Sequence, residues 1–236
     1  MEYRLFPLGD QAVVIELGSG LSPETFRKIQ TVSSFFEHNQ PDWLVDFTPA
    51  FTTVTLFYDA FFIDKHYEHR MLPYQFVCSF LHTQLISLIA DQTLTSRMIE
   101  IPVCYGGELG PDLADVASCN SLTESEVIHI HSNAIYTVYM LGFAPGFPYL
   151  GGMSEKISAP RKSFPRLSIP ARSVGIAGIQ TGIYPIETPG GWQIIGQTPI
   201  DLFLPNEDPP TLLRAGDQIR FIPISYEQFL TWEADA

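Results

Sequence analysis

The first 95 residues alternate between two hydrophobic periods, one typical of strands and one typical of helices. Strand-like alternation lies at 3–7, 12–17, 43–47 and 52–58. Apolar residues at helical spacing run from Pro23 to about Phe36 and from Pro73 to about Ile89. The order ββαββα predicts a small α+β domain over residues 1–95, with two helices on one face of an antiparallel sheet.

Local signals mark where two helices begin. Ser22 carries a side-chain oxygen that can cap a helix, Pro23 suits the first helical position, and Glu24 places negative charge at the positive end of the helix dipole. Further along, Thr123 and Glu126 have the spacing of a capping box. We therefore expect helices to start directly after Ser22 and after Thr123.

A polar stretch at 91–97 lacks both periods and predicts a domain boundary. Beyond it we expect two helices, at 111–119 and from 121 onward, and no further long helix after residue 134. Short strands between Gly and Pro turns are expected at 99–105, 136–143, 173–177, 182–185, 192–197 and 218–224. This pattern predicts a mainly β domain, a barrel or a sandwich, over residues 96–236.

The charge of the chain narrows the classes of partner. With 13 Lys and Arg against 26 Asp and Glu, the formal net charge is -13, and such a surface repels nucleic acid and anionic lipid. Three cysteines without a CxxC pair argue against a disulfide framework. No signal peptide is recognised, and no apolar run approaches the ~20 residues of a spanning helix. We expect a cytoplasmic protein with neither nucleic-acid nor membrane partners.

Three aromatic residues, Phe143, Phe147 and Tyr149, stand among glycines and prolines in the run 141–152. The glycines allow close backbone approach, and the prolines stiffen the loop. Rigid turns that carry large rings are typical of a pocket wall, so these residues are candidates for substrate binding. The alternative is a loop that folds its aromatic rings into the core.

Two later glycine-rich pieces, at 176–184 and 189–192, add candidates of the same kind. Gln180 and Tyr184 in the first piece offer polar groups to a small ligand, and Trp192 in the second offers an apolar wall. Neither piece is followed by the Lys-Ser/Thr of a Walker motif. A nucleotide would therefore find no familiar phosphate site here.

Positive charge is concentrated in one segment of this acidic chain. Five of the 13 Lys and Arg lie between residues 156 and 172: Lys156, Arg161, Lys162, Arg166 and Arg172. A guanidinium group holds a carboxylate or phosphate through two parallel hydrogen bonds, so Arg161 and Arg166 are candidates for binding an anionic substrate. The alternative is a solvated basic loop that balances local acids.

His131 is expected at the end of a predicted helix. A helix C-terminus favours the imidazolium form, and this position suits proton transfer, whereas the alternative is a structural histidine. His129 points elsewhere and no third ligand is indicated, so no metal site is expected. Cys104 follows an apolar strand and is expected to be a buried, inert thiol. Asp112 is interpreted as a helix-start charge.

Several of these motifs, in order along nearly the full chain, resemble one family. The run 136–152 looks like the signature of the B subunit of bacterial 5-oxoprolinase, a family also described as allophanate hydrolase subunit 1 and as an inhibitor of a sporulation histidine kinase. Further similar segments lie at 101–107, 173–178, 180–185 and 189–192. One departure is Arg172, where the family usually has glycine.

The resemblance implies a cyclophilin-like β-barrel for the second domain and a small α/β domain for the first. It implies that the chain acts with the C and A subunits of 5-oxoprolinase, and with ATP, to open the lactam of 5-oxo-L-proline to L-glutamate. For this function, the expected catalytic residues are His131, Arg161 and Arg166. The expected substrate-binding residues are Phe143, Phe147, Tyr149, Gln180, Tyr184 and Trp192. The alternative function, inhibition of a histidine kinase, predicts an exposed apolar patch for docking.

Overall fold

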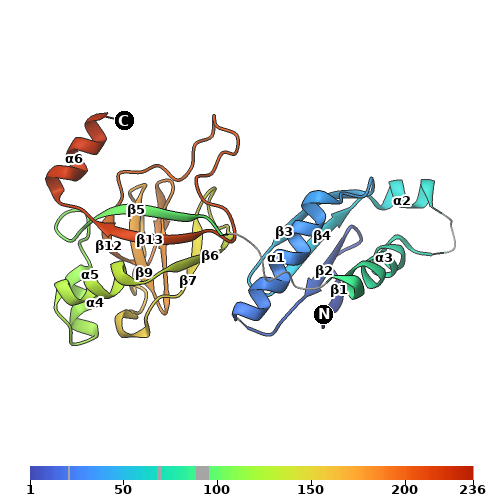
Figure 1. Cartoon of the computed structure of the whole chain (residues 1–236), viewed down its shortest axis with the longest axis horizontal. Helices are drawn as coiled ribbons and strands as arrows, with labels where there is room; N and C mark the ends of the chain where they lie inside the picture. Colours follow the sequence, from blue (N-terminus) through green and yellow to red (C-terminus); the bar gives the residue numbers. More distant parts are fainter. Residues whose placement is uncertain (21, 68–70, 89–95, 236) are drawn as a thin grey trace. The chain divides into compact units, whose positions relative to one another are not determined.

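The computed structural model describes residues 1–20, 22–67, 71–88 and 96–235. The chain divides into two compact units, Met1–Thr95 and Ser96–Ala236 (Figure 1). The polar boundary predicted at 91–97 lies largely outside the described residues. No helix in the described part of the chain has the length and apolar character needed to cross a membrane.

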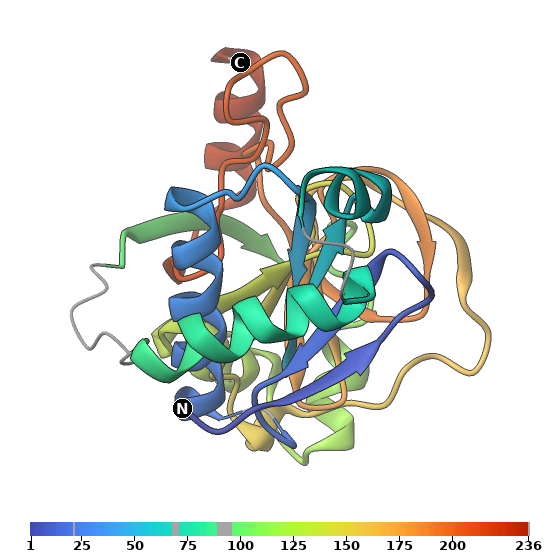
Figure 2. The same cartoon turned by 90° about the vertical axis from the view of Figure 1, so that its right-hand side faces the viewer.

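The first unit is a four-stranded antiparallel sheet with helices packed on it. Its strand order is β1-β2-β4-β3, with β1 at Arg4–Pro7, β2 at Ala12–Glu16, β3 at Leu44–Pro49 and β4 at Thr53–Tyr58. The helices are α1 (Pro23–His38), α2 (Ala60–His66) and α3 (Pro73–Ser87). Alternate strand residues such as Val13, Ile15, Val54 and Leu56 are fully buried in one cluster with α1 and α3. Both helices therefore cover the same face of the sheet (Figure 2).

Side-chain caps mark the starts of α1 and α2. Helix α2 was not predicted from the sequence because it is short. Ser22 accepts a hydrogen bond from the Thr25 amide, as predicted for the start of α1. Helix α2 has only seven residues, with Asp59 accepting from the Phe62 amide at 2.8 Å. Ile63 is the only residue of α2 that is fully buried among those described. One buried position gives no hydrophobic period, so the sequence pattern did not predict this helix.

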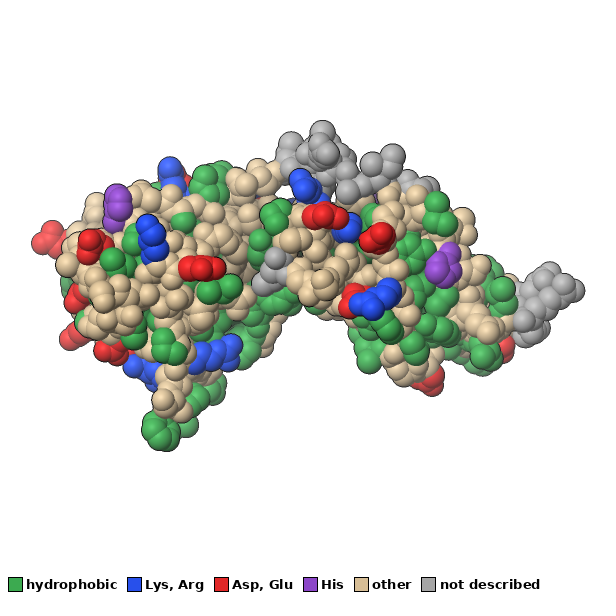
Figure 3. Space-filling view, turned by 90° about the horizontal axis from the view of Figure 1, so that it is seen from below, with side chains coloured by type: hydrophobic (Ala, Val, Ile, Leu, Met, Phe, Trp, Pro, Cys, Tyr) green, Lys and Arg blue, Asp and Glu red, His purple; other side chains and the backbone are tan. Residues whose placement is uncertain are grey.

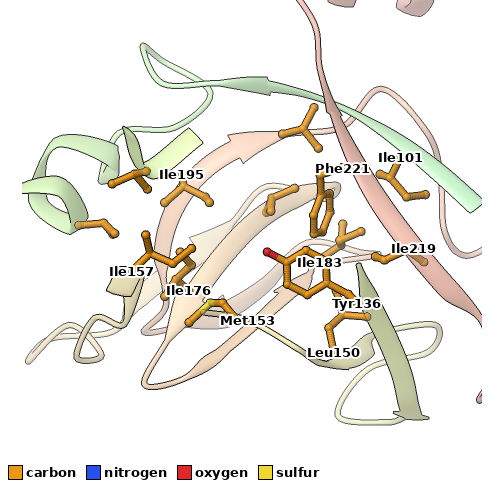
Figure 4. Packing of buried hydrophobic residues seen from close by; sticks show 14 of the residues in the cluster. Ile101, Tyr136, Leu150, Met153, Ile157, Ile176, Ile183, Ile195, Ile219 and Phe221 are labelled. Carbon is orange, nitrogen blue, oxygen red and sulfur yellow. The ribbon is translucent and has the colours of Figure 1, made fainter. Parts of the chain in front are cut away.

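The second unit is built on a closed barrel of seven strands, in the order β10-β7-β6-β13-β5-β12-β9. The strands are β5 (Met98–Tyr105), β6 (Tyr136–Leu141), β7 (Pro148–Gly151), β9 (Ser173–Ala177), β10 (Gln180–Ile183), β12 (Gln193–Gln197) and β13 (Gln218–Pro223). Strands β5 and β13 pair in parallel, and the other neighbours pair antiparallel. Inward residues such as Ile101, Ile176, Ile183 and Phe221 fill the interior (Figure 4). The predictions of a small antiparallel sheet with helices and of a β-barrel are confirmed.

Smaller elements surround the barrel. Helices α4 (Leu113–Cys119) and α5 (Glu124–Asn133) pack on it together, and Thr123 and Glu126 form the predicted capping box of α5. A short 3-10 helix lies at Glu155–Ile157. The last helix, α6 (Tyr226–Asp235), has ten residues and was not predicted, since we expected no further long helix after residue 134. Among its residues with described side chains, exposed Tyr226, Leu230 and Trp232 accompany one buried residue, Phe229, so no apolar stripe stands out in the sequence.

A two-stranded ribbon stands apart from the barrel sheet. It pairs β8 (Arg166–Ile169) with β11 (Thr188–Gly190). Thr188 faces Ile169, but Gly190 faces Arg166, so β8 holds one more residue than β11 between these two pairs. Such a β-bulge changes the direction of side chains along a strand. Arg166 and Ile169 both turn inward as a result, although their odd spacing on a regular strand would place them on opposite faces.

Candidate functional site

A cluster of aromatic rings fills one end of the second unit, and its members come from three of the predicted motifs. The aromatic cluster consists of Phe147, Tyr184 and Trp192, with Ile169, Ala177 and Ile194 packed beside them. Phe147 meets Tyr184 at 5.4 Å and Trp192 at 5.5 Å between ring centroids, in edge-to-face geometry. Exposures of 2% for Phe147 and 6% for Trp192 make these two rings core residues. Phe147 and Trp192 are therefore folded into the core, which is the alternative to lining an open pocket.

Phe143 behaves differently from the other rings of its loop. It is 65% exposed and has a backbone φ of 69°, a left-handed conformation that bulky residues rarely adopt. Its ring stands edge-on to Phe147 at 5.4 Å and to Tyr184 at 6.4 Å. Tyr149 is half-buried, 5.1 Å from the ring of Phe147. Phe143 therefore presents an aromatic ring to solvent above the aromatic cluster.

Tyr184 is anchored through its hydroxyl. The Trp192 amide donates a hydrogen bond to the phenol oxygen, and burial raises the pKa of Tyr184 to about 12. A Cβ on Gly190 would lie 2.6 Å from this oxygen and 2.7 Å from the Cδ1 of Ile169. Only glycine therefore fits at position 190 without moving the ring. Tyr184 stays a neutral hydrogen-bonding group at neutral pH.

The main electrostatic feature of this region is a buried carboxylate, that of Asp112. The residue is 2% exposed, and its Oδ1 accepts from Arg166 Nη2 and from Lys162 Nζ, each at 2.7 Å. Its Oδ2 accepts from the Ile194 amide, also at 2.7 Å. Burial alone raises the pKa of the Asp112 carboxyl, but the hydrogen bonds from Arg166, Lys162 and Ile194 outweigh it, and the pKa is lowered overall.

These contacts correct the interpretation of Asp112 as a helix-start charge. Asp112 occupies the position before α4, but its side chain makes no capping hydrogen bond there. Instead it joins α4 to β8 and β12, which are far away in the sequence. The sequence-based interpretation located Asp112 correctly at the start of α4 but missed its side-chain contacts, because these partners lie 54 and 82 residues further along the chain.

The Arg166 guanidinium has one paired and one unpaired terminal nitrogen. Its Nη2 is bound to Asp112, whereas its buried Nη1 has no hydrogen-bond partner among the described residues. Buried nitrogen atoms of this kind are normally hydrogen-bonded, so an unpaired one needs an explanation. Arg161 is exposed and forms no ion pair in the described part of the chain. Both guanidinium groups act electrostatically on the Tyr184 phenol, so both lie near it.

The predicted basic segment is thus only partly a free positive patch. Lys162 and Arg166 both pair with Asp112, whose single negative charge offsets only one of the two cations, and Lys162 also lies 3.6 Å from Asp115. Arg172 reaches Asp201 at 3.7 Å and donates to the Pro199 carbonyl at 3.2 Å. Its φ of 69° gives a physical reason for the glycine that the family usually has at this position. The side chain of Arg172 turns toward Asp201.

His131 lies inside the barrel and not at its surface. It is fully buried, its Nδ1 lies 2.8 Å from the Tyr105 hydroxyl, and its Nε2 lies 2.9 Å from the Thr181 hydroxyl. Thr181 uses its own proton on the Gly175 carbonyl, so Nε2–H donates to Thr181 and Nδ1 accepts from Tyr105. Burial lowers the pKa of His131 to about 3. The imidazolium expected at the helix end is therefore a wrong prediction, because burial outweighs the helix dipole.

The remaining candidates lie near the aromatic cluster or in the barrel wall. Gln180 is half-buried and pairs with Ala177, a member of the aromatic cluster, across the turn between β9 and β10. Cys104 is buried, and burial raises the pKa of its thiol, which agrees with an inert cysteine. Across the described residues, no three His, Cys, Asp or Glu side chains gather to hold a metal ion. The site is therefore built from the aromatic cluster, Arg161 and the Asp112–Arg166 pair.

Comparisons with known proteins place this chain in a family. The family model described as carboxyltransferase domain, subdomain C and D, matches residues 3–213. The 5-oxoprolinase B subunit of Bacillus subtilis (strain 168) is 48% identical over 237 residues, which cover 100% of this chain and 99% of that protein. The 5-oxoprolinase B subunit of Haemophilus influenzae is 42% identical over 219 residues, covering 93% of this chain and 97% of that protein. The crystal structure of TTHA0988 matches with a TM-score of 0.76 at 34% identity, covering 91% of this chain and 40% of that one. The chain therefore belongs to the carboxyltransferase subdomain C and D family and, within it, to the group of 5-oxoprolinase B subunits.

Proposed function

We propose that this chain is a subunit of an ATP-dependent 5-oxoprolinase, which opens the lactam of 5-oxo-L-proline to L-glutamate. The observation that carries the proposal is the 48% identity with the B subunit of the Bacillus subtilis enzyme over the full length of both chains. The chain acts with the C and A subunits as partners, and ATP is a co-substrate of the complex. A cytoplasmic location and a cyclophilin-like type of barrel belong to the same proposal.

Opening a lactam with ATP requires a site that stabilises negative charge on oxygen atoms. An unstrained lactam is a poor electrophile, and its nitrogen is a poor leaving group. Transfer of the γ-phosphoryl group of ATP to the carbonyl oxygen activates the ring carbon. Attack by water then breaks the carbon–nitrogen bond, with the proton going to nitrogen, and hydrolysis of the acyl phosphate by a second water gives glutamate and phosphate. Each step places negative charge on oxygen atoms, which preorganised cationic donors stabilise.

The residues around the aromatic cluster suit the anionic groups of this reaction. Arg166 has one guanidinium nitrogen bound to Asp112 and one buried nitrogen without a partner among the described residues. Arg161 is exposed, also lies near the Tyr184 phenol, and adds a second planar donor. In our proposal these two groups bind the substrate carboxylate or the transferred phosphoryl group, and the exposed ring of Phe143 packs on the lactam. For His131 we propose a structural role in place of proton transfer, because both ring nitrogens are used inside the barrel.

The test replaces Arg166 and, separately, Arg161 by lysine in the chain assembled with its partner subunits. Lysine keeps the charge but loses the planar pair of donors. We expect glutamate formation to fall about ten- to hundredfold, which corresponds to the roughly 1.5–3 kcal/mol of a charged hydrogen bond. Arg220→Lys is the matched control, since Arg220 is a half-exposed barrel residue that pairs with Glu100. Wild-type rates in both site variants would remove Arg161 and Arg166 from the anion site.

Inhibition of a histidine kinase is a second candidate function, and one observation favours it. That function requires an exposed apolar patch, and Phe164 and Leu167 are 88% and 93% exposed. To test this function, the autophosphorylation rate of a purified histidine kinase is measured with increasing amounts of this chain. Inhibition by the wild type, lost in a Phe164→Ser/Leu167→Ser variant, would support the second candidate. Unchanged autophosphorylation would eliminate it.

A further inference from the structure

The two most exposed large hydrophobic side chains in the described part of the molecule lie three positions apart in the sequence. Leu167 is 93% exposed and Phe164 is 88% exposed. Both belong to the segment 161–168, which includes the first three residues of β8 in the ribbon. In Figure 2 the gold part of the chain that contains this segment extends away from the barrel. We call residues 161–168 the docking segment.

The fold itself directs these side chains outward. The β-bulge in β8 turns Arg166 and Ile169 toward the interior, where Arg166 pairs with Asp112 and Ile169 is fully buried. The residues between them, Leu167 and Ser168, are left facing solvent. The same β-bulge that turns Arg166 inward therefore leaves Leu167 exposed. The position of the Leu167 side chain is set by the paired backbone of β8.

The charge around the docking segment differs from that of the whole chain. Residues 156–172 hold five Lys and Arg and no Asp or Glu, whereas the chain carries a formal net charge of -13. Figure 3 shows Lys and Arg side chains gathered beside a hydrophobic projection on the unit that contains the barrel. Lys162, Arg166 and Arg172 pair with acids of this chain, whereas Arg161 is exposed and forms no ion pair in the described part of the chain. A partner that covers Phe164 and Leu167 therefore meets two large apolar groups beside the positive charge of Arg161. A surface with an apolar recess bordered by carboxylates meets both requirements.

We propose that the docking segment is the contact surface for the partner subunit that supplies the remaining subdomains of the carboxyltransferase domain. This chain matches only subdomains C and D of that domain. In TTHA0988, which shares the fold at 34% identity, the matched region is 40% of a longer chain, so further protein accompanies this unit there. The inference rests on the proposed function, because the B subunit of a 5-oxoprolinase acts within a complex.

Docking at this place also bears on the anion site. Arg161 and Arg166 are part of the docking segment, so a partner seated on Phe164 and Leu167 reduces the access of water to both guanidinium groups. A lower local dielectric strengthens their attraction for a bound anion. The partner therefore completes the site, and this chain alone binds the substrate anion more weakly than the complex does.

The experiment measures assembly and activity separately. The chain is co-purified with a tagged partner subunit, and the dissociation constant is measured by titration for the wild type, Phe164→Ser, Leu167→Ser and the double variant. Each single change is expected to weaken association at least about tenfold, as for central apolar residues of an interface, with the double variant weaker still. Added salt is expected to weaken wild-type association, because positive charge meets carboxylates. Ile135→Ser, at a site 55% exposed on the same unit, is the matched control with unchanged association.

Circular dichroism and thermal midpoints check that each variant remains folded, which solvent-facing positions should allow. Wild-type association in the folded double variant would overturn the proposal. So would a wild-type chain that fails to bind the partner, or one that forms a dimer dissolved by the double variant, since a second copy would then be the occupant. Association that depends on Phe164 and Leu167 in a complex without 5-oxoproline-dependent ATP hydrolysis would uphold the docking surface and refute the proposed function.

Discussion

The buried carboxylate of Asp112 and the partly buried guanidinium of Arg166 form an ion pair between residues 54 positions apart in the chain. The same Oδ1 atom accepts from Lys162, and the other oxygen accepts from the Ile194 amide, so the carboxylate is fixed on three sides. Arg166 consequently has one preferred orientation, with Nη2 on Asp112 and Nη1 left for another partner. Because a donor that is held in place loses less entropy on binding an anion, we expect Asp112 to be a positioning residue for the proposed anion site.

Replacing Asp112 by asparagine separates positioning from plain stability. Both Asp112→Asn and Asp217→Asn remove a buried carboxylate, since Asp217 is 4% exposed and accepts from Arg97 and from the Arg214 amide. Each substitution weakens several hydrogen bonds to a buried carboxylate, which should cost roughly 1–3 kcal/mol, so both variants should unfold at lower denaturant concentration. Only Asp112→Asn should also raise KM for 5-oxoproline in the assembled complex. Equal KM values in the two variants would leave Asp112 with a structural role alone.

The two phenylalanines of the 142–147 loop should respond in opposite ways. Phe147 is buried against Tyr184 and Trp192, so Phe147→Ala should cost about 3–5 kcal/mol of unfolding free energy. Phe143 is exposed and has a positive φ, so Phe143→Gly removes backbone strain of about 1–2 kcal/mol and should leave stability unchanged or higher. We expect this second variant to lose substrate affinity. Urea unfolding and KM measured side by side check both statements, and a destabilised Phe143→Gly would contradict them.

Neighbouring glycines offer a test of the packing around Tyr184. A methyl group at position 190 meets the Tyr184 oxygen at 2.6 Å, whereas at position 191 the nearest atom, the Lys162 carbonyl oxygen, is 3.6 Å away. Gly190→Ala should therefore destabilise the second unit by about 1–3 kcal/mol and disturb the near-ultraviolet dichroism of the aromatic cluster. Gly191→Ala should change the free energy of unfolding by less than about 0.5 kcal/mol. Similar losses in both variants would refute this account of Gly190.

Much of the fold could be predicted because its signals are local. Ser22 caps α1, and Thr123 with Glu126 caps α5, because a capping residue and its amide partners lie within three positions of each other. The strands of the barrel have short apolar runs ended by glycine and proline. The helices α2 and α6 were missed because a single buried residue among the described side chains of each, Ile63 or Phe229, gives no hydrophobic period to detect.

The candidate site was predicted in part, and the missing part is long-range. Arg161 and Arg166 stood out as cations in an acidic chain, but nothing near Asp112 in the sequence points to its partner Arg166. The β-bulge that aims Arg166 inward depends on pairing with β11, which the strand pattern does not contain. His131 was misjudged because local position gives the helix dipole but not the burial, and burial is the larger effect.

The burial of His131 leads to a prediction about acid stability. The ring has a pKa of about 3 in the folded protein, below the ordinary value of 6.5 that applies after unfolding. As the pH falls below about 6.5, His131 becomes protonated in the unfolded chain but stays neutral in the folded chain. The free energy of unfolding therefore decreases by roughly 1.4 kcal/mol per pH unit through this residue. The loss continues down to about pH 3. Above pH 6.5 neither state is protonated, and the full stability remains.

The measurement is the free energy of unfolding of the second unit, by urea titration, between pH 7 and pH 4.5. The wild type should lose roughly 2–3 kcal/mol over this range through His131, and His131→Gln should lose that much less. His129→Gln, at an exposed position two residues earlier, leaves His131 in place and should keep the wild-type contribution. If His131→Gln is too unstable for urea titration, NMR of the wild-type imidazole resonances tests the same prediction. The resonances of His131 should not shift with pH above pH 4.5. A titration of the folded ring near pH 6 would show that water reaches it, and would restore His131 as a candidate for proton transfer.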